Sequence, residues 1–356
     1  MSAERPTWMI YGAYGFTGQH IAREAVKRGH RPLLAGRSAK KLRALAAELG
    51  LNYRAFSLDD PAALAGALRD VDLVLHCAGP FAETAAPMRL ACLESHTNYL
   101  DITGELPVFA GTFDLDAEAR RHSLLLMSGV GFDVVPSDCL ARYVSRHVRS
   151  ADHLEIAVTT NTSPTGGTAR SALGMLPGVG LVRRDHALTR VNPREAVREV
   201  PLPSGAARAI PVPLPDLVSA YHSTYIPNIT TYLVYSFRRG APPPGVLLAL
   251  AEVLAISPVR WLAQKLAGLL ARGPSPEGMQ RGRSLVWAKV SREDGACFEA
   301  WLETPEPYRL TAVAAVRAVE RVLAERPIGA LTPSQAFGED FVLEVDGTRR
   351  YDELPG

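Results

Sequence analysis

The sequence predicts an α/β protein that has a doubly wound parallel sheet near its N-terminus and a second α+β domain after it. Three observations support this prediction. Short apolar runs alternate with amphipathic helical stretches through residues 1–135, which is typical of βαβ units. The first run, residues 8–11, ends in a glycine-rich turn. The chain has 356 residues, more than one domain usually holds, so we expect a second domain.

The glycine-rich turn has the spacing G-x-x-G-x-x-G and leads into a helix with an apolar stripe. Glycine is needed where the backbone adopts a positive φ and approaches a pyrophosphate closely, and the helix that follows offers N–H groups to the phosphates. The turn therefore predicts the dinucleotide site of a Rossmann-type domain, although ordinary turn glycines would match the same short pattern. The predicted cofactor contacts in this turn are Gly12, Tyr14, Gly15, Phe16, Thr17 and Gly18.

A second apolar run, residues 32–35, ends where an NAD-binding protein would place an acidic residue against the ribose 2′-hydroxyl. Arg37 stands there instead, and Ser38 and Lys41 follow it. A guanidinium can clamp a 2′-phosphate with charge-assisted hydrogen bonds, so we predict NADP(H) as the cofactor and these three residues as contacts. The alternative is a solvated helix start, where basic residues are unfavourable without an anion.

The next strands supply the rest of the predicted cofactor site. Residues 52–56 form a short strand, and Asp60 caps the helix after it. Asp59 is a candidate contact for the adenine, because this loop leaves the carboxyl end of the sheet. Residues 72–77 form the fourth strand. The turn after it, Ala78-Gly79-Pro80, is predicted to lie over the nicotinamide half of the cofactor.

The composition limits the classes of function. A formal charge of +2 with 21% charged residues gives no reason to expect nucleic acid as a partner. The four cysteines are scattered without the spacing of a metal site, so we expect no metal and a reducing, cytoplasmic location. The N-terminal residues lack the apolar segment of a signal peptide.

The second half of the chain predicts a mixed or antiparallel sheet. Runs typical of strands lie at residues 153–159, 228–237, 285–292 and 297–303. Five prolines within residues 201–215 indicate edge strands or an extended hairpin. Residues 309–326 have the apolar spacing of an amphipathic helix, which ends before Pro327.

Seven short motifs, spread over nearly the whole chain, occur together in one known family. They are Tyr11–Gly18, Leu34–Ser38, Cys77–Pro80, Tyr99–Glu105, Gly131–Asp138, Ala220–Asn228 and Glu303–Thr311. The pattern resembles the saccharopine dehydrogenase-like family of NADP-binding oxidoreductases, which includes the mycobacterial trans-acting enoyl reductases. The resemblance implies a Rossmann domain over residues 1–135, a second α+β domain over 136–308, and NADPH in the crevice between them. It also implies that residues 309–356 return to the first domain.

Residues 246–271 are the least polar helical stretch, with only Glu252, Arg260 and Lys265 as charges. On general grounds they predict a pair of buried or dimer-interface helices, and we therefore expect a homo-oligomer, most simply a homodimer. The alternative is an apolar lid that handles lipid-like substrates or rests on a membrane surface, which would make the protein membrane-associated.

The leading hypothesis for function is an NADPH-dependent reductase of an enoyl C=C bond in an apolar, polyketide- or lipid-like acyl substrate. A reductase of C=N bonds in amino acids, the chemistry of saccharopine, is the alternative, and a non-catalytic NADP-binding, lipid-associated protein is a third hypothesis. Arg170, Arg183 and Arg184 could bind an acidic substrate, although isolated arginines are more often surface charges. The Tyr-x-x-x-Lys motif of short-chain dehydrogenases does not occur.

Reduction of an enoyl thioester needs a donor for the enolate oxygen and an acid for the α-carbon. Tyr99 and Asp101 lie two positions apart on the strand that starts at residue 98, so they share a face of that strand. His222 comes from the second domain, and domain closure could bring it over the nicotinamide. We predict Tyr99 and His222 as proton donors and Asp101 as the residue that orients a donor.

Overall fold

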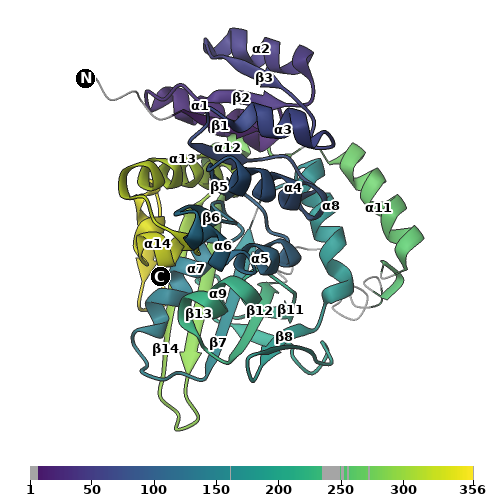
Figure 1. Cartoon of the computed structure of the whole chain (residues 1–356). Helices are drawn as coiled ribbons and strands as arrows, with labels where there is room; N and C mark the ends of the chain where they lie inside the picture. Colours follow the sequence, from purple (N-terminus) through teal and green to yellow (C-terminus); the bar gives the residue numbers. More distant parts are fainter. Residues whose placement is uncertain are drawn as a thin grey trace. The chain divides into compact units, whose positions relative to one another are not determined.

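The computed structural model describes residues 7–160, 162–234, 249, 252–254, 256–271 and 273–355 (Figure 1). The chain forms two compact units. The first unit comprises Met1–Thr103, Pro107–Val135 and Tyr308–Phe337, and the second comprises Gly104–Leu106, Pro136–Pro307 and Gly338–Gly356. Among the described residues, no helix combines the length and the apolar character that a membrane span requires.

The first unit holds a parallel sheet of seven strands in the order β15-β6-β5-β4-β1-β2-β3. The strands are β1 (Trp8–Tyr11), β2 (Leu33–Gly36), β3 (Tyr53–Ala55), β4 (Leu73–His76), β5 (Asn98–Asp101), β6 (Leu125–Met127) and β15 (Gly329–Ala330). The strand order reverses at β1, which lies between β2 and β4. This reversal is the switch point of a doubly wound Rossmann fold, so the predicted fold class is confirmed.

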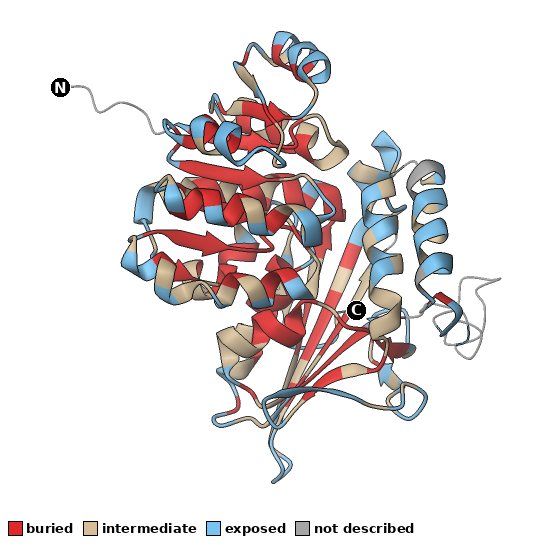
Figure 2. Cartoon of the chain, turned by 45° about the vertical axis from the view of Figure 1, so that its right-hand side comes forward, coloured by how far each residue is buried: buried red, intermediate tan, exposed pale blue. Residues whose placement is uncertain are grey.

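Helices connect and cover these strands, as the βα alternation of the sequence predicts. They are α1 (Phe16–Lys27), α2 (Ala39–Leu49), α3 (Pro61–Leu68), α4 (Phe81–Glu94), α5 (Leu106–Phe113), α6 (Asp116–Arg121), α13 (Pro307–Glu325) and α14 (Pro333–Phe337). All four residues of β1 and of β4 are buried, as expected for central strands covered on both faces (Figure 2). Asp60 caps α3 by accepting a hydrogen bond from Ala63 N at 3.0 Å, which confirms the predicted cap.

The second unit holds a mixed sheet of nine strands. The strands are β7 (His153–Thr160), β8 (Leu181–Arg184), β9 (Ala187–Arg190), β10 (Arg198–Val200), β11 (Ala207–Pro211), β12 (Asn228–Val234), β13 (Arg283–Ser291), β14 (Cys297–Pro305) and β16 (Arg349–Tyr351). Only the pairing of β7 with β12 is parallel among the pairings described. Trp287 and Trp301 pack in its core with Tyr232.

Five α-helices accompany this sheet in the described part of the second unit. They are α7 (Val135–Ser145), α8 (Gly166–Met175), α9 (Asp216–Thr224), α11 (Ser257–Leu270) and α12 (Pro276–Arg281). The prolines of residues 201–215 flank β11, which pairs antiparallel with the edge strand β10, so the predicted edge hairpin is confirmed. Of the apolar stretch 246–271, residues 246–248, 250, 251 and 255 lie outside the described part, and α11 accounts for most of the remainder.

The C-terminal residues divide between the two units. Residues 308–337 group with the first unit, whereas 338–356 group with the second because β16 pairs with β14. The Arg350 guanidinium adds an ion pair to Asp340 at 2.8 Å and lies 3.6 Å from the ring centre of Tyr143 on α7. The sequence prediction had assigned the whole of residues 309–356 to the first domain.

Helix α13 is held in the first unit by an ion-pair cluster around Glu320. Arg28 donates two hydrogen bonds to this carboxylate, at 2.9 and 2.7 Å, and His30 Nε2 lies 2.9 Å from it. Burial acts to raise the pKa of Glu320, but the hydrogen bonds from Arg28 and His30 and the nearby positive charges outweigh it and lower the pKa to about 2. The folded state therefore favours the ionised form.

Replacing Glu320 by glutamine is expected to lower the free energy of unfolding by about 1–3 kcal/mol at neutral pH. Because the pKa is lower in the folded state, the stabilisation is complete above the ordinary pKa of 4.5 and is lost as the pH falls from there towards 2. Urea denaturation at a series of pH values measures this. Glu325→Gln, which removes an exposed ion pair with Arg321, is the control and should cost well under about 1 kcal/mol.

Candidate cofactor and active site

The turn between β1 and α1 is too tight for side chains at two of its glycines. Gly12 has a φ of +86°, and a Cβ atom there would lie 2.8 Å from the backbone N of Ala78. A Cβ atom on Gly18 would lie 2.4 Å from the carbonyl oxygen of Gly12. The backbone N–H of Gly12 donates to the Ala35 carbonyl at 2.8 Å, which ties the turn to β2. Close backbone contacts, together with a positive φ at Gly12, thus explain why glycine is needed at positions 12 and 18.

The start of α1 has the properties of an anion site. Gly15 is the N-cap in extended conformation and has no side chain to cap the helix, and no acidic residue lies in the first turn. The N–H groups of Phe16, Thr17 and Gly18 have no intrahelical partner, because they belong to the first turn. Together with the positive end of the helix dipole, they fit the pyrophosphate of a dinucleotide.

Basic and aromatic side chains gather at the carboxyl end of β2. Arg37 is exposed, and within the described residues no ion pair or hydrogen bond involves its guanidinium. Lys41 Nζ lies 5.5 Å from the ring centre of Tyr14, whose ring covers Gly36. Ser38 caps α2 by accepting from Lys41 N at 3.4 Å. This end of β2 therefore carries positive charge that could bind a 2′-phosphate, and the contact itself stays a prediction.

Arg37 and Asp59 both lie near the buried Tyr11. Burial raises the pKa of the Tyr11 hydroxyl to about 12, the charge of Arg37 opposes the rise, and Asp59 adds to it. Asp59 is exposed and accepts a hydrogen bond from Ser57 Oγ at 2.9 Å. Its position beside the end of β3 is compatible with the predicted adenine contact, which stays a prediction.

Replacing Arg37 by alanine is expected to weaken NADPH binding by roughly 10- to 150-fold, because a charge-assisted hydrogen bond contributes about 1.5–3 kcal/mol. NADH lacks the 2′-phosphate, so its affinity should hardly change. Titration of each reduced nucleotide by its fluorescence measures both constants. An equal loss for both nucleotides would contradict this role of Arg37, and Lys40→Ala serves as a nearby control on α2.

The end of β4 forms a turn that Thr84 holds closed. The Thr84 hydroxyl contacts the Ala78 carbonyl at 2.7 Å, the Pro80 carbonyl at 3.0 Å and His76 Nε2 at 3.0 Å. The Gly79–Pro80 peptide bond is cis. His76 is fully buried, and burial lowers its pKa to about 3, so the imidazole is neutral at physiological pH. His76 is therefore a structural residue of the turn.

Asp101, at the end of β5, is the centre of a buried hydrogen-bond network. Its Oδ1 accepts from the backbone N–H groups of Thr103, at 3.0 Å, and Gly129, at 2.9 Å. Its Oδ2 accepts from the Tyr99 hydroxyl, at 2.9 Å, and from Ser128 Oγ, at 2.7 Å. The carboxylate thereby joins the ends of β5 and β6, two of the strands whose carboxyl ends form the predicted site.

The network continues behind Ser128 to a buried arginine. Ser128 Oγ lies 2.8 Å from Thr112 Oγ1 on α5, and Arg89 donates to that same hydroxyl at 2.6 Å and to the Val108 carbonyl at 2.8 Å. Burial raises the pKa of the Asp101 carboxyl, and the four hydrogen bonds it accepts lower it only in part. Arg89, Thr112 and Ser128 could not be predicted from sequence as members of this network, because a single polar residue in a helix or after a strand forms no pattern.

The structure brings Tyr99 and Asp101 together, as their shared strand face predicts. Tyr99 is fully buried, its hydroxyl donates to Asp101, and burial together with the nearby Asp101 charge raises its pKa well above the usual value. The hydrogen bond between the Tyr99 hydroxyl and the Asp101 carboxylate fixes the orientation of both groups. The arrangement disfavours Tyr99 as a direct proton donor, because the side chain has no exposed surface.

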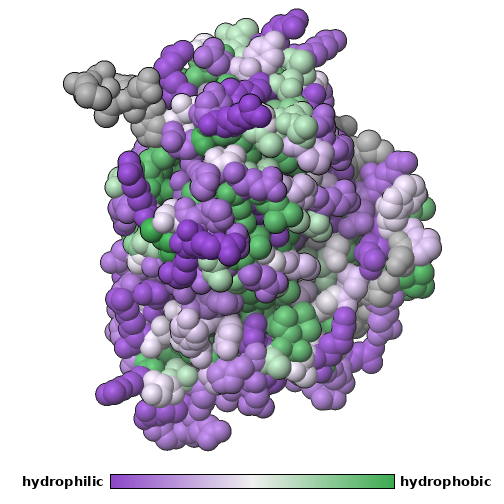
Figure 3. All heavy atoms as spheres, viewed as in Figure 1, coloured by the Kyte–Doolittle hydropathy of each residue, from purple (hydrophilic) through white to green (hydrophobic). Residues whose placement is uncertain are grey.

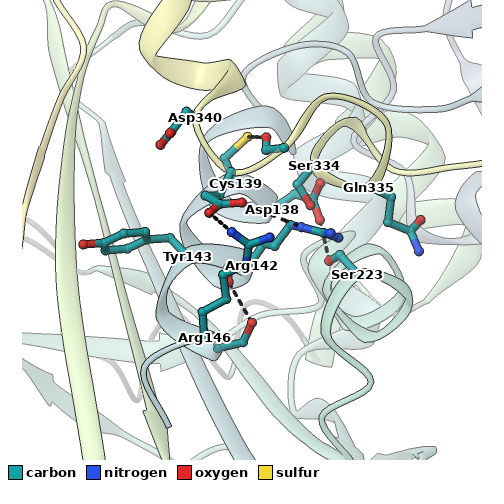
Figure 4. A network of polar contacts seen from close by, with 12 residues as sticks. Asp138, Cys139, Arg142, Tyr143, Arg146, Ser223, Ser334, Gln335 and Asp340 are labelled. Atoms are coloured by element: carbon teal, nitrogen blue, oxygen red, sulfur yellow. Dashed lines mark hydrogen bonds and ion pairs between the residues drawn. The ribbon is translucent and has the colours of Figure 1, made fainter. Parts of the chain in front are cut away.

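His222 lies on α9 of the second unit, next to Tyr221. The Ser223 hydroxyl, one residue further, donates to Asp138 Oδ1 at 2.6 Å and fixes α9 to α7 (Figure 4). Tyr221 packs against the Arg183 guanidinium, 4.0 Å from the ring centre, and its hydroxyl lies 3.1 Å from His186 Nδ1. The predicted donor thus stands on a helix that partly buried polar contacts hold to α7.

The first turns of α13 complete the carboxyl edge of the first unit's sheet. The Tyr308 ring packs edge-on against Phe16 with centres 5.1 Å apart. Thr311 Oγ1 accepts from Phe132 N at 3.0 Å, and a Cβ atom on Gly131 would lie 2.9 Å from the Thr311 methyl group. Sequence reasoning gave these residues no role, and the only signal for them was the motif Glu303–Thr311.

Within the described residues, no group of three or more His, Cys, Asp or Glu side chains could hold a metal ion. The features described so far define the class of NADP-binding Rossmann proteins. They are the parallel sheet, the glycine turn at its switch point, the uncapped start of α1 and the exposed arginine after β2. Residues 8–125 match the family model described as the saccharopine dehydrogenase NADP binding domain. Residues 8–125 therefore form a domain of the saccharopine dehydrogenase NADP-binding type, so the predicted resemblance and the predicted cofactor NADP(H) are confirmed.

Two curated relatives carry related names. The chain is 32% identical over 161 residues to a trans-acting enoyl reductase of Mycobacterium ulcerans, a match that covers 42% of this chain and 38% of the relative. It is 28% identical over 214 residues to the saccharopine dehydrogenase-like oxidoreductase of Mus musculus, covering 52% and 49%. The chain thus spans less than half the length of either relative. Both names describe oxidoreductases.

A solved structure extends the likeness of fold to nearly the whole chain. Apo saccharopine dehydrogenase (L-Glu forming) from Saccharomyces cerevisiae superposes with a TM-score of 0.61 over 96% of each chain, at 14% identity. At this identity the likeness concerns the fold alone. It includes the second, mixed-sheet unit as well as the Rossmann unit.

Proposed function

We propose that the protein is an NADPH-dependent reductase of an enoyl C=C bond in an apolar, polyketide- or lipid-like acyl substrate. The NADP-binding domain and the name of the mycobacterial relatives support the reaction class. A homodimer in the cytoplasm remains our expectation for its state and location. The observation that favours this reaction over saccharopine-like reduction concerns three arginines.

Arg170, Arg183 and Arg184 were the candidates for binding an acidic substrate, and each is engaged within the protein. Arg183 donates to the Leu217 carbonyl at 2.8 Å and to the His186 carbonyl. Arg184 donates to Thr230 Oγ1 at 3.1 Å, and Arg170 donates to the Gly166 carbonyl at 3.2 Å. Saccharopine carries several carboxylates that would need such cations. The internal contacts of Arg183 and Arg184 favour a substrate without carboxylates, whereas Arg170 is exposed and bonds to a carbonyl of its own helix.

When bound, NADPH supplies the hydride that this reduction requires. The chain's own residues must then protonate the α-carbon and stabilise the enolate oxygen. We propose His222 as the proton donor, because an imidazole changes charge near physiological pH. We propose that Asp101 and Tyr99 hold the ends of β5 and β6 in place. These ends belong to the carboxyl edge of the sheet, where the cofactor and the substrate of such folds bind.

Replacing His222 by alanine is expected to lower the single-turnover rate of NADPH oxidation with a medium-chain 2-enoyl thioester by about 10²- to 10⁴-fold, the usual contribution of an acid–base residue. Wild-type protein should not oxidise NADPH with lysine and 2-oxoglutarate. His153→Ala, on β7 of the second unit, is the control. An unchanged rate in His222→Ala would exclude it as the acid, and oxidation with the amino-acid pair alone would favour the saccharopine-like reaction.

A further inference from the structure

Exposed apolar side chains of the second unit are concentrated on α11 and in the residues just before it. Seven of the fifteen large apolar residues that are exposed in the described part of the chain fall between residues 253 and 270. They are Val253, Ile256, Val259, Trp261, Leu262, Leu266 and Leu270. Figure 2 shows α11 exposed over much of its length, and hydrophobic residues lie at its margin in Figure 3. A patch of this kind marks an interaction surface.

The opposite side of α11 is already used, because it packs on α8. Ala263, Gln264 and Ala267 are half-buried, and Gln264 Nε2 donates to the Arg170 carbonyl of α8 at 3.1 Å. With 100° between successive residues, Trp261, Leu262, Lys265 and Leu266 then point away from α8. We call these four residues the outer face of α11. Trp261 is 62% exposed, and Lys265 Nζ lies 4.9 Å from its ring centre.

The charged side chains of α8 and α11 are all basic. α8 and α11 contain Arg170, Arg260 and Lys265 and no acidic residue, and the exposed Glu252 precedes α11. A face of Trp and Leu with a lysine at its centre suits the boundary of an anionic bilayer, where the apolar groups enter the acyl region and the ammonium reaches the phosphates. In a twofold dimer whose axis crosses α11 at Lys265, the two Lys265 side chains would meet with no acidic residue of α8 or α11 to pair with them.

We propose that the outer face of α11 is a docking surface for anionic phospholipid bilayers. This inference is independent of the proposed reaction, because it uses no residue of the cofactor site. It assigns α11 to the surface of a membrane.

The tryptophans of this chain provide a direct probe. Trp8, Trp287 and Trp301 are 4%, 1% and 4% exposed, so Trp261 is the one tryptophan in contact with solvent. Adding vesicles of phosphatidylcholine and phosphatidylglycerol to the full chain should shift its emission to the blue, and lipids with brominated acyl chains should quench it. Vesicles of phosphatidylcholine alone should give a much smaller shift, and raising salt from about 0.1 to about 0.5 M should release the protein. In Trp261→Phe the shift should vanish while sedimentation with vesicles persists.

The double variant Leu262→Ser/Leu266→Ser should reduce the fraction that sediments with anionic vesicles by roughly tenfold or more. Leu90→Ser is the matched control, since Leu90 on α4 has the same exposed fraction, 52%, as Leu262. Wild-type protein that leaves the emission and sedimentation unchanged would overturn the proposal. A dimer in light scattering that the double variant converts to a monomer, without vesicle binding, would show that a second copy covers this face instead.

Discussion

Replacing Gly18 by valine is expected to reduce NADPH affinity by at least about 100-fold. The new Cβ would lie 2.4 Å from the Gly12 carbonyl oxygen and 3.0 Å from Ala13 Cα, both of which are backbone atoms that cannot rotate away. The turn must open to admit it, at a cost of about 3 kcal/mol or more, and the N–H groups of α1 then lose their alignment with the phosphates. Fluorescence titration of NADPH measures the loss.

Two comparisons separate a local effect from general unfolding. Gly66→Ala on α3 is the control, because a Cβ there meets no atom within 4 Å and alanine favours a helix. Gly18→Ala introduces the same clash with a smaller side chain, so it should bind NADPH more weakly than wild type while keeping a cooperative thermal transition. Normal NADPH affinity in a folded Gly18→Val protein would mean that the phosphates lie elsewhere.

Replacing Asp101 by leucine is expected to lower the free energy of unfolding by about 3–5 kcal/mol, the largest stability effect in the first unit. Leucine has the same branched shape but a larger volume and accepts no hydrogen bond. The N–H groups of Thr103 and Gly129 and the hydroxyls of Tyr99 and Ser128 therefore lose their acceptor inside the core. The two hydroxyls can rotate to other acceptors, but the two N–H groups cannot. Urea denaturation followed by circular dichroism measures the change.

Tyr99→Phe is the matched comparison, because it removes one donor and leaves Asp101 with three. It should cost only about 1 kcal/mol. If Asp101→Leu were as mild as Tyr99→Phe, the carboxylate would not be holding β5 to β6. A role of Asp101 in the reaction, instead of in stability, would then be favoured.

The β1 strand, its glycine turn and Arg37 could be predicted from sequence because each rests on a local requirement. A positive φ at Gly12, a buried apolar run and the absence of an acid after β2 are all visible within a few residues. The sequence order of strands β1 to β6 likewise predicts the doubly wound sheet. These features need no knowledge of distant contacts.

The roles of His76 and Asp101 could not be predicted, because both lie in strands buried on both faces. Such strands have no alternation that would tell which side chains point to the site and which point to the core. Asp101 is enclosed by contacts with Ser128 and Gly129, which are 27 and 28 residues away in sequence, and His76 by Thr84 near the start of α4. For the same reason β16 was assigned to the first domain, although its pairing with β14 places it in the second unit.

The most direct test of the whole account is the transfer of a labelled hydride. Full-length protein is mixed with NADPH that carries deuterium on one face of nicotinamide C4 and with a 2-enoyl thioester of medium chain length, and the acyl product is analysed by mass spectrometry. We expect a saturated product with one deuterium at the β-carbon from one of the two stereospecifically labelled nucleotides and none from the other. Recovery of unreacted enoyl thioester, with NADPH bound but not oxidised, would contradict the proposed reduction.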